Sequence, residues 1–190
     1  MKKSLLLVLL LAVFLQGCGA VLISGVATGA AVIHDRRSAG TVLDDKAIQF
    51  KIISAIDANK DLDEHSSVSA TSYNYAVLLT GQTENTSYRE RVVELARNTP
   101  LVKRVIDQIE IGEPSTFSQI THDAYLTAKV KLELLDIGLS SFDPTRIKVV
   151  TDNSIVYLMG LVTQEEANAV VEKVRYIKDV ERVIKIFEYI

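Results

Sequence analysis

The hydrophobic and polar positions of the chain predict the same series of elements twice. In the first copy, apolar residues at helical spacing are followed by two β-prone runs, 68–72 and 75–81, around a turn at Asn74. In the second copy the runs are 147–151 and 155–160, and Asp152 and Asn153 predict the turn. The core-facing helical positions are Ile48, Ile52, Ala55 and Ile56 in the first copy, and Leu126, Val130, Leu134 and Ile137 in the second.

A second helix and a third strand are predicted to complete each copy. In the second copy, Thr163-x-x-Glu166 has the spacing of a capping box that opens a helix. Residues 180–189 then have the alternation of a strand. Each copy is therefore predicted to be a helix–strand–strand–helix–strand unit of the α+β class, with two helices on one face of a three-stranded mixed sheet.

Short motifs recur between the two copies in the same order. The motif at 45–52 recurs at 123–130, the Val-x-Leu-x-Gly motif at 77–81 recurs at 156–160, and the motif at 102–105 recurs at 180–183. The nearly constant offset of 78 or 79 residues indicates an internal duplication. Gly112 to Ser118, which contains Pro114, is the predicted linker between domains at 41–111 and 119–190.

The N-terminus has the pattern of an export signal. Lys2 and Lys3 precede an apolar run of about a dozen residues, too short for a membrane span. Gly17 and Cys18 follow, in a pattern that resembles the bacterial lipoprotein lipobox. This pattern predicts a signal peptide at 1–17, a cysteine that receives diacylglycerol and an N-acyl chain, and a tether at 18–40. An uncleaved anchor helix and a buried cysteine are the alternatives.

Composition restricts the function further. Removal of the predicted signal peptide leaves 173 residues and changes the formal charge from −3 to −5, which argues against a nucleic-acid partner. Cys18 is the single cysteine, so no disulfide is expected within the chain and packed cores must stabilise it.

Each unit, with its Val-x-Leu-x-Gly strand, resembles the BON domain of bacterial envelope proteins. A lipobox, a tether and two such units resemble the lipid-binding lipoproteins associated with division and outer-membrane stress. This resemblance implies an outer-membrane protein anchored at the periplasmic face and enriched at the division site. It also implies binding of anionic phospholipid such as phosphatidylglycerol, and partners that include the lipoprotein maturation and sorting machinery and envelope or division proteins.

No catalytic constellation is visible in the sequence. His34 falls in the predicted linker at 34–40, His65 in a predicted loop, and His122 beside Asp123 at a predicted helix start, where the helix dipole explains the acid. The two glycines of the repeated motif, Gly81 and Gly160, are interpreted as strand ends. We therefore expect no enzyme, no metal and no cofactor besides the acyl chains on Cys18.

The opening helix of the second copy has an additional apolar stripe, which we name the outer stripe. Its members lie about 120° from the core face, and Lys129 and Lys131 flank them. Either the outer stripe contacts lipid or it packs against the first domain. The resemblance favours lipid, because Tyr125 matches the family's aromatic position in its lipid-contacting helix. A periplasmic scaffold that holds an envelope protein or peptidoglycan is the alternative function. The outer stripe consists of Tyr125, Ala128, Leu132 and Leu135.

Overall fold

The computed structural model describes residues 35–140 and 142–190. Arg36–Ile190 forms one compact unit, and the three hydrophobic clusters described below lie within it, so this unit has the cores that it needs to fold. The predicted signal peptide, Cys18 and the tether up to His34 lie outside the described residues. In the described part of the chain, no helix has the length and apolar character of a membrane span.

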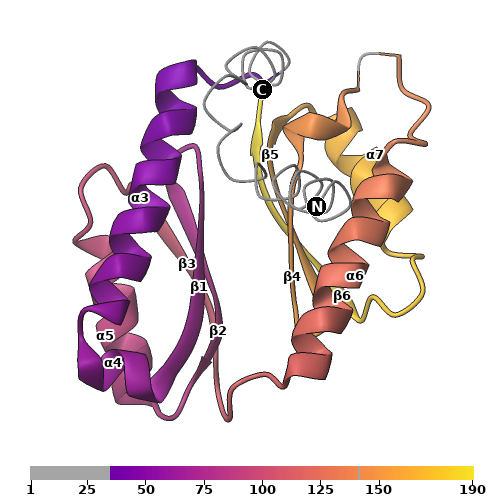
Figure 1. Cartoon of the computed structure of the whole chain (residues 1–190). Helices are drawn as coiled ribbons and strands as arrows, with labels where there is room; N and C mark the ends of the chain where they lie inside the picture. The colour runs from indigo at the N-terminus through magenta and orange to yellow at the C-terminus, as the bar shows by residue number, and fades with distance from the viewer. Residues whose placement is uncertain (1–34, 141) are drawn as a thin grey trace, which may run out of the picture. The chain divides into compact units, whose positions relative to one another are not determined.

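The duplication and the α+β class are confirmed (Figure 1). The central strand of each sheet pairs antiparallel with the preceding strand and parallel with the following one. The first repeat contains α3 (Ala39–Asp57), α4 (Lys60–His65), β1 (Ser66–Tyr73), β2 (Ala76–Thr83), α5 (Thr86–Arg97) and β3 (Arg104–Ile111). The second contains α6 (Phe117–Leu134), the 3-10 turn η3 (Pro144–Arg146), β4 (Lys148–Asp152), β5 (Ile155–Val162), α7 (Gln164–Val174) and β6 (Arg182–Tyr189).

Several local predictions differ from the structure. His65 ends the short helix α4 instead of lying in a loop, and Ala55 is exposed instead of core-facing. Helix α3 begins at Ala39, inside the segment predicted as linker, because the Ser38 side chain accepts a hydrogen bond from the Thr41 backbone N–H. Helix α6 likewise begins inside the predicted 112–118 linker, where Thr116 provides a capping box.

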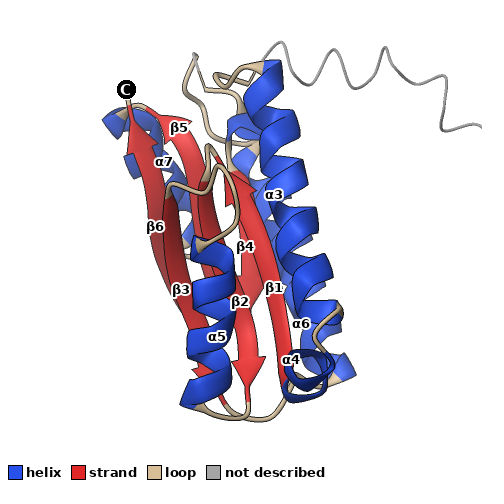
Figure 2. Ribbon diagram, turned by 90° about the vertical axis from the view of Figure 1, so that its left-hand side faces the viewer, coloured by secondary structure: helices blue, strands red, loops and turns tan. Residues whose placement is uncertain are grey.

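Each repeat has a hydrophobic core between its helices and its own sheet. Val77 and Leu79 of β2 face the first core, and Val156 and Leu158 of β5 face the second. The intervening residues of these strands point to the opposite face of each sheet. There they form a third cluster that joins the two repeats, so the two sheets pack face to face with the helices outside (Figures 1 and 2). This third cluster consists of Tyr73, Leu78, Ile155, Tyr157, Met159 and Ile186.

The interpretation of the two motif glycines as strand ends is wrong. Gly81 lies within β2 at φ +111°, and a Cβ there would be 2.1 Å from the Ser67 carbonyl oxygen. Gly160 lies within β5, where a Cβ would be 3.0 Å from the Arg146 carbonyl oxygen. Both positions are glycine because the neighbouring backbone approaches closely, and Gly81 also needs its positive φ.

The dipole interpretation of Asp123 is also wrong, and Asp45 occupies the corresponding position in the first repeat. Both are buried residues well inside α6 and α3, beyond the first turns. Each carboxylate accepts hydrogen bonds from the two backbone N–H groups of the adjacent hairpin turn, at 2.8–2.9 Å. All four turn residues have positive φ, as a two-residue hairpin turn of this hand requires. The first turn is Asn74–Tyr75, so it contains the predicted Asn74 but also Tyr75, which was predicted to begin the next strand. The second turn is Asn153–Ser154, one residue later than predicted.

Candidate functional site

The outer stripe lies on the exposed side of α6. Tyr125, Leu132 and Leu135 are 59%, 65% and 64% exposed, whereas the core-facing residues Leu126 and Val130 of the same helix are completely buried. The possibility that the outer stripe packs against the first repeat is therefore excluded, since the sheets make that contact instead. Clusters of exposed large apolar side chains on one helix are unusual on a water-facing surface.

Two further apolar residues extend this exposed side toward the start of α6. Phe117 is 84% exposed and Ile120 is also exposed. They were missed because they fall in the predicted linker and at the predicted helix start. The signal that could have identified them is helical spacing, since Phe117, Ile120, Ala124 and Ala128 follow one another at intervals of three, four and four residues.

A groove of about 600 Å³ runs beside the end of the outer stripe. It lies between α6 and the segment that leads into β4, and no carboxylate lines it. Three of the four members of the outer stripe contribute, so the groove continues the apolar surface of α6. Its lining residues are Ala128, Lys131, Leu132, Leu135, Pro144, Thr145, Ile147, Lys148 and Val149.

The predicted flanking lysines have different surroundings. Lys129 donates a hydrogen bond from Nζ to the Lys178 carbonyl oxygen at 3.1 Å, and its Nζ lies 6.0 Å from the centre of the Tyr125 ring. Lys131 lines the groove together with Lys148, which the sequence did not identify. Burial lowers the pKa of Lys148, and repulsion from Lys46, Lys131 and Arg37 lowers it further. The groove therefore has a cationic border.

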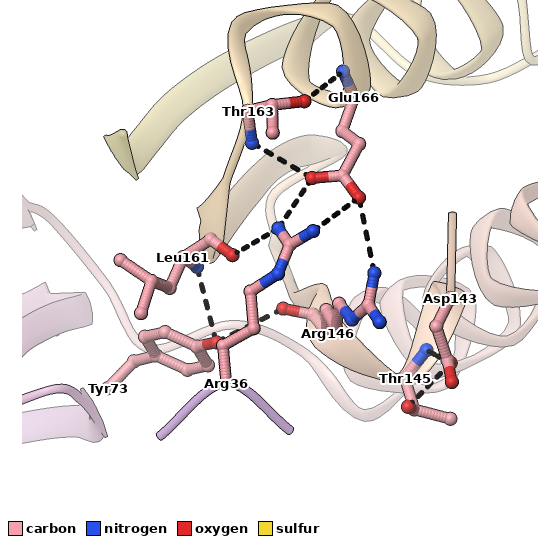
Figure 3. A network of polar contacts seen from close by, with 8 residues as sticks. All are labelled: Arg36, Tyr73, Asp143, Thr145, Arg146, Leu161, Thr163 and Glu166. Carbon is pink, nitrogen blue, oxygen red and sulfur yellow. Dashed lines mark hydrogen bonds and ion pairs between the residues drawn. The ribbon is translucent and has the colours of Figure 1, made fainter. Parts of the chain in front are cut away.

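The chain enters the compact unit beside this border, through the polar network of Figure 3. The Arg36 guanidinium donates to both carboxylate oxygens of Glu166, at 2.6 and 2.9 Å, and to the Leu161 carbonyl oxygen at 3.0 Å. Arg146 donates to the same carboxylate at 3.2 Å. Glu166 is also part of the predicted capping box with Thr163, which is confirmed. A residue of the predicted tether is thus bound to the second repeat.

Arg37 makes the corresponding contact with the first repeat. It donates to the Asp45 carboxylate at 2.7 Å, and its guanidinium lies 3.8 Å from the centre of the Tyr73 ring. The Tyr73 hydroxyl in turn donates to the Arg146 carbonyl oxygen and accepts from the Leu161 backbone N–H, both in the second repeat. Consecutive arginines therefore connect the start of the compact unit to both repeats.

The Asp123 carboxylate, which follows His122 in the sequence, serves the second hairpin. Both Asp123 carboxylate oxygens accept backbone hydrogen bonds from the β4–β5 turn, so the carboxylate is committed to the hairpin. Among residues 35–140 and 142–190, no group of three or more His, Cys, Asp or Glu side chains could hold a metal ion.

Comparison with known proteins agrees with this architecture. The model of the BON domain matches residues 44–113 and 122–189, so the chain belongs to the BON-domain family. Outer membrane lipoprotein DolP of Haemophilus influenzae is 36% identical over 188 residues, which cover 99% of this chain and 96% of that protein. A 21 kDa hemolysin of Actinobacillus pleuropneumoniae is 32% identical over 156 residues, or 82% of this chain and 79% of that protein. The predicted resemblance to dual BON-domain lipoproteins is confirmed.

Proposed function

We propose that this chain is an outer-membrane lipoprotein, anchored through Cys18 at the periplasmic face, that binds anionic phospholipid through α6. Its similarity to an outer membrane lipoprotein along nearly its whole length supports the location. The protein acts by binding and not by catalysis. Through this contact it supports outer-membrane integrity and cell division, at the division site.

The observation that carries the proposal is the uncovered apolar surface of α6. The acyl chains on Cys18 would already provide attachment, so the outer stripe is available for a second, reversible contact with lipid. A tyrosine suits the membrane interface, because its ring can be buried while its hydroxyl remains hydrated. Lys129 and Lys131 are placed to meet lipid phosphates at the edges of the outer stripe.

The test measures binding of residues 35–190 to vesicles of phosphatidylcholine with and without phosphatidylglycerol. Tyr125→Asp and Leu132→Asp should each weaken binding to the anionic vesicles at least tenfold, because burial of such a side chain contributes about 1.5–3 kcal/mol. Both residues are exposed, so the urea unfolding transition should remain cooperative and nearly unchanged.

Leu101→Asp is the control. Leu101 is exposed, lies outside α3 and α6, and corresponds to Asp179 of the second repeat, which has the same backbone conformation. This variant should bind vesicles as the parent chain does. If the parent chain does not bind anionic vesicles, or if Leu101→Asp weakens binding as much as Leu132→Asp does, lipid binding through α6 is wrong. Capture of peptidoglycan or of an envelope protein by a chain that ignores vesicles would favour the scaffold function.

A further inference from the structure

Three lysines from both repeats gather at the border of the α6 groove. Lys131 and Lys148 line the groove itself. Lys46 of α3 follows Asp45, which binds Arg37 over the Tyr73 ring, and the Tyr73 hydroxyl donates to the carbonyl oxygen of Arg146, two residues before Lys148. The positive charge of Lys46 accordingly contributes to the lowered pKa of Lys148. Within the described residues, none of the three makes an ion pair or a side-chain hydrogen bond. Arg37, the fourth cation nearby, is paired with Asp45.

This arrangement is unfavourable unless an anion joins it. A half-buried ammonium group that faces other cations loses hydration and gains no opposite charge in return. The described residues that line the groove include no acidic side chain. An anion among these lysines would neutralise the cluster and raise the pKa of Lys148 toward its ordinary value.

The surroundings of the cluster indicate what kind of anion fits. The same groove is lined by Leu132, Leu135 and Val149, so its occupant needs an apolar part beside its charged part. The chain also enters the compact unit close by, since Arg36 and Arg146 share the Glu166 carboxylate and Arg146 is two residues from Lys148. Arg36, the first residue of the compact unit, therefore lies close to the lysines.

We propose that Lys46, Lys131 and Lys148 bind the phosphate group of a membrane lipid while the groove beside them contacts its acyl chains. This inference rests on the proposed lipid contact of α6 and adds its headgroup site. Because Lys46 belongs to the first repeat, the site is complete only when the two repeats are docked through their sheets. The first repeat then contributes directly to lipid binding instead of serving as a spacer.

The experiment compares Lys46→Gln, Lys148→Gln and the control Lys51→Gln in residues 35–190. Lys51 is an exposed lysine of α3 that makes no ion pair among the described residues. Its replacement by glutamine removes one positive charge, as the other two replacements do. Each cation near an anionic surface contributes about 1 kcal/mol, or roughly fivefold in affinity. Lys46→Gln and Lys148→Gln should therefore weaken binding to phosphatidylglycerol vesicles about fivefold, and Lys51→Gln much less. The difference should shrink in high salt.

Three outcomes distinguish this inference from the proposed function. If Leu132→Asp abolishes vesicle binding but Lys46→Gln behaves like Lys51→Gln, the α6 contact holds and the inter-repeat headgroup site is wrong. If the parent chain does not bind vesicles, both proposals fail. The third outcome concerns free phosphate and is tested by titration with inorganic phosphate, followed through the NMR signals of the lysine side chains. Saturable shifts at Lys46 and Lys148, combined with unchanged vesicle binding of the Lys46→Gln and Lys148→Gln variants, would identify soluble phosphate as the ligand. That result would overturn the lipid assignment.

Discussion

A single aspartate in each repeat fastens the opening helix to the β-hairpin. The carboxylates of Asp45 and Asp123 replace water as acceptors for the two N–H groups of a turn whose residues all have positive φ. A buried N–H without an acceptor is costly, so the helix and the turn depend on one another. This dependence explains why the aspartate recurs in the duplicated motif at an offset of 78 residues.

Asp123→Ala should lower the free energy of unfolding by about 2–4 kcal/mol, because two backbone donors lose a charged acceptor. Urea denaturation followed by circular dichroism measures the change. Asp136→Ala, which removes an exposed carboxylate from the same repeat, should alter stability by no more than about 0.5 kcal/mol. Equal effects of the two substitutions would contradict the role assigned to Asp123.

At the scale of elements, local patterns predicted most of the fold. Strand alternation, the Thr163 capping box and the repeated motifs depend on residues close in sequence, and they are confirmed. The contact between the repeats through their sheets was not predicted, although β5 is apolar at nearly every position. Such a run indicates a strand buried on both faces, and it would have shown that the second face of the sheet, not the outer stripe, meets the first repeat.

The candidate site could be predicted only in part, because some of its residues are far apart in the sequence and come together only in the folded unit. The outer stripe is a helical pattern within one segment and could be read directly. Lys46 and Lys148 come from different repeats, and only the docked sheets bring them together. Phe117 and Ile120 were missed because the start of α6 was placed too late.

The two motif glycines should differ in their tolerance of a side chain. Gly81→Ala combines a backbone overlap at 2.1 Å with a φ that L-residues avoid, and it should cost about 3 kcal/mol or more. Gly160→Ala meets its nearest atom at 3.0 Å without the unfavourable φ, and it should cost about 1–2 kcal/mol. Thermal unfolding of both variants tests this order, and a Gly160→Ala variant that is the less stable of the two would refute it.

At the scale of the whole unit, the repeats are joined by an approximately reciprocal set of contacts. Asn74 of the first hairpin donates to Glu188 of β6 at 2.5 Å, and Asn153 of the second hairpin donates to Glu110 of β3 at 3.1 Å. Arg36 departs from this symmetry, because it binds the second repeat alone. It also stands directly before α3 of the first repeat, which begins at Ala39. The contact of Arg36 with the second repeat therefore helps to hold the two repeats together.

The Arg36–Glu166 pair predicts how this unit responds to acid. Burial alone would raise the pKa of Glu166, but the hydrogen bonds from Arg36 and the Thr163 backbone, together with the positive charges of Arg36 and Arg146, outweigh it and lower the pKa below the ordinary 4.5. A lowered pKa means that the charged carboxylate stabilises the folded state above about pH 4.5, and that this contribution disappears as the pH falls through the folded-state pKa. Glu166→Gln should therefore be less stable than the parent chain by about 1–3 kcal/mol at neutral pH.

The difference between the two chains should shrink as the pH is lowered below 4.5 and through the folded-state pKa of Glu166, because the parent carboxylate then becomes neutral as well. Urea unfolding at a series of pH values measures this convergence. Glu172→Gln is the control, since Glu172 pairs with Arg175 at an exposed site where such pairs contribute little. The difference in the free energy of unfolding between the parent chain and Glu166→Gln could instead stay constant over the whole acid range. In that case the charge of the Glu166 carboxylate does not hold Arg36 to the second repeat.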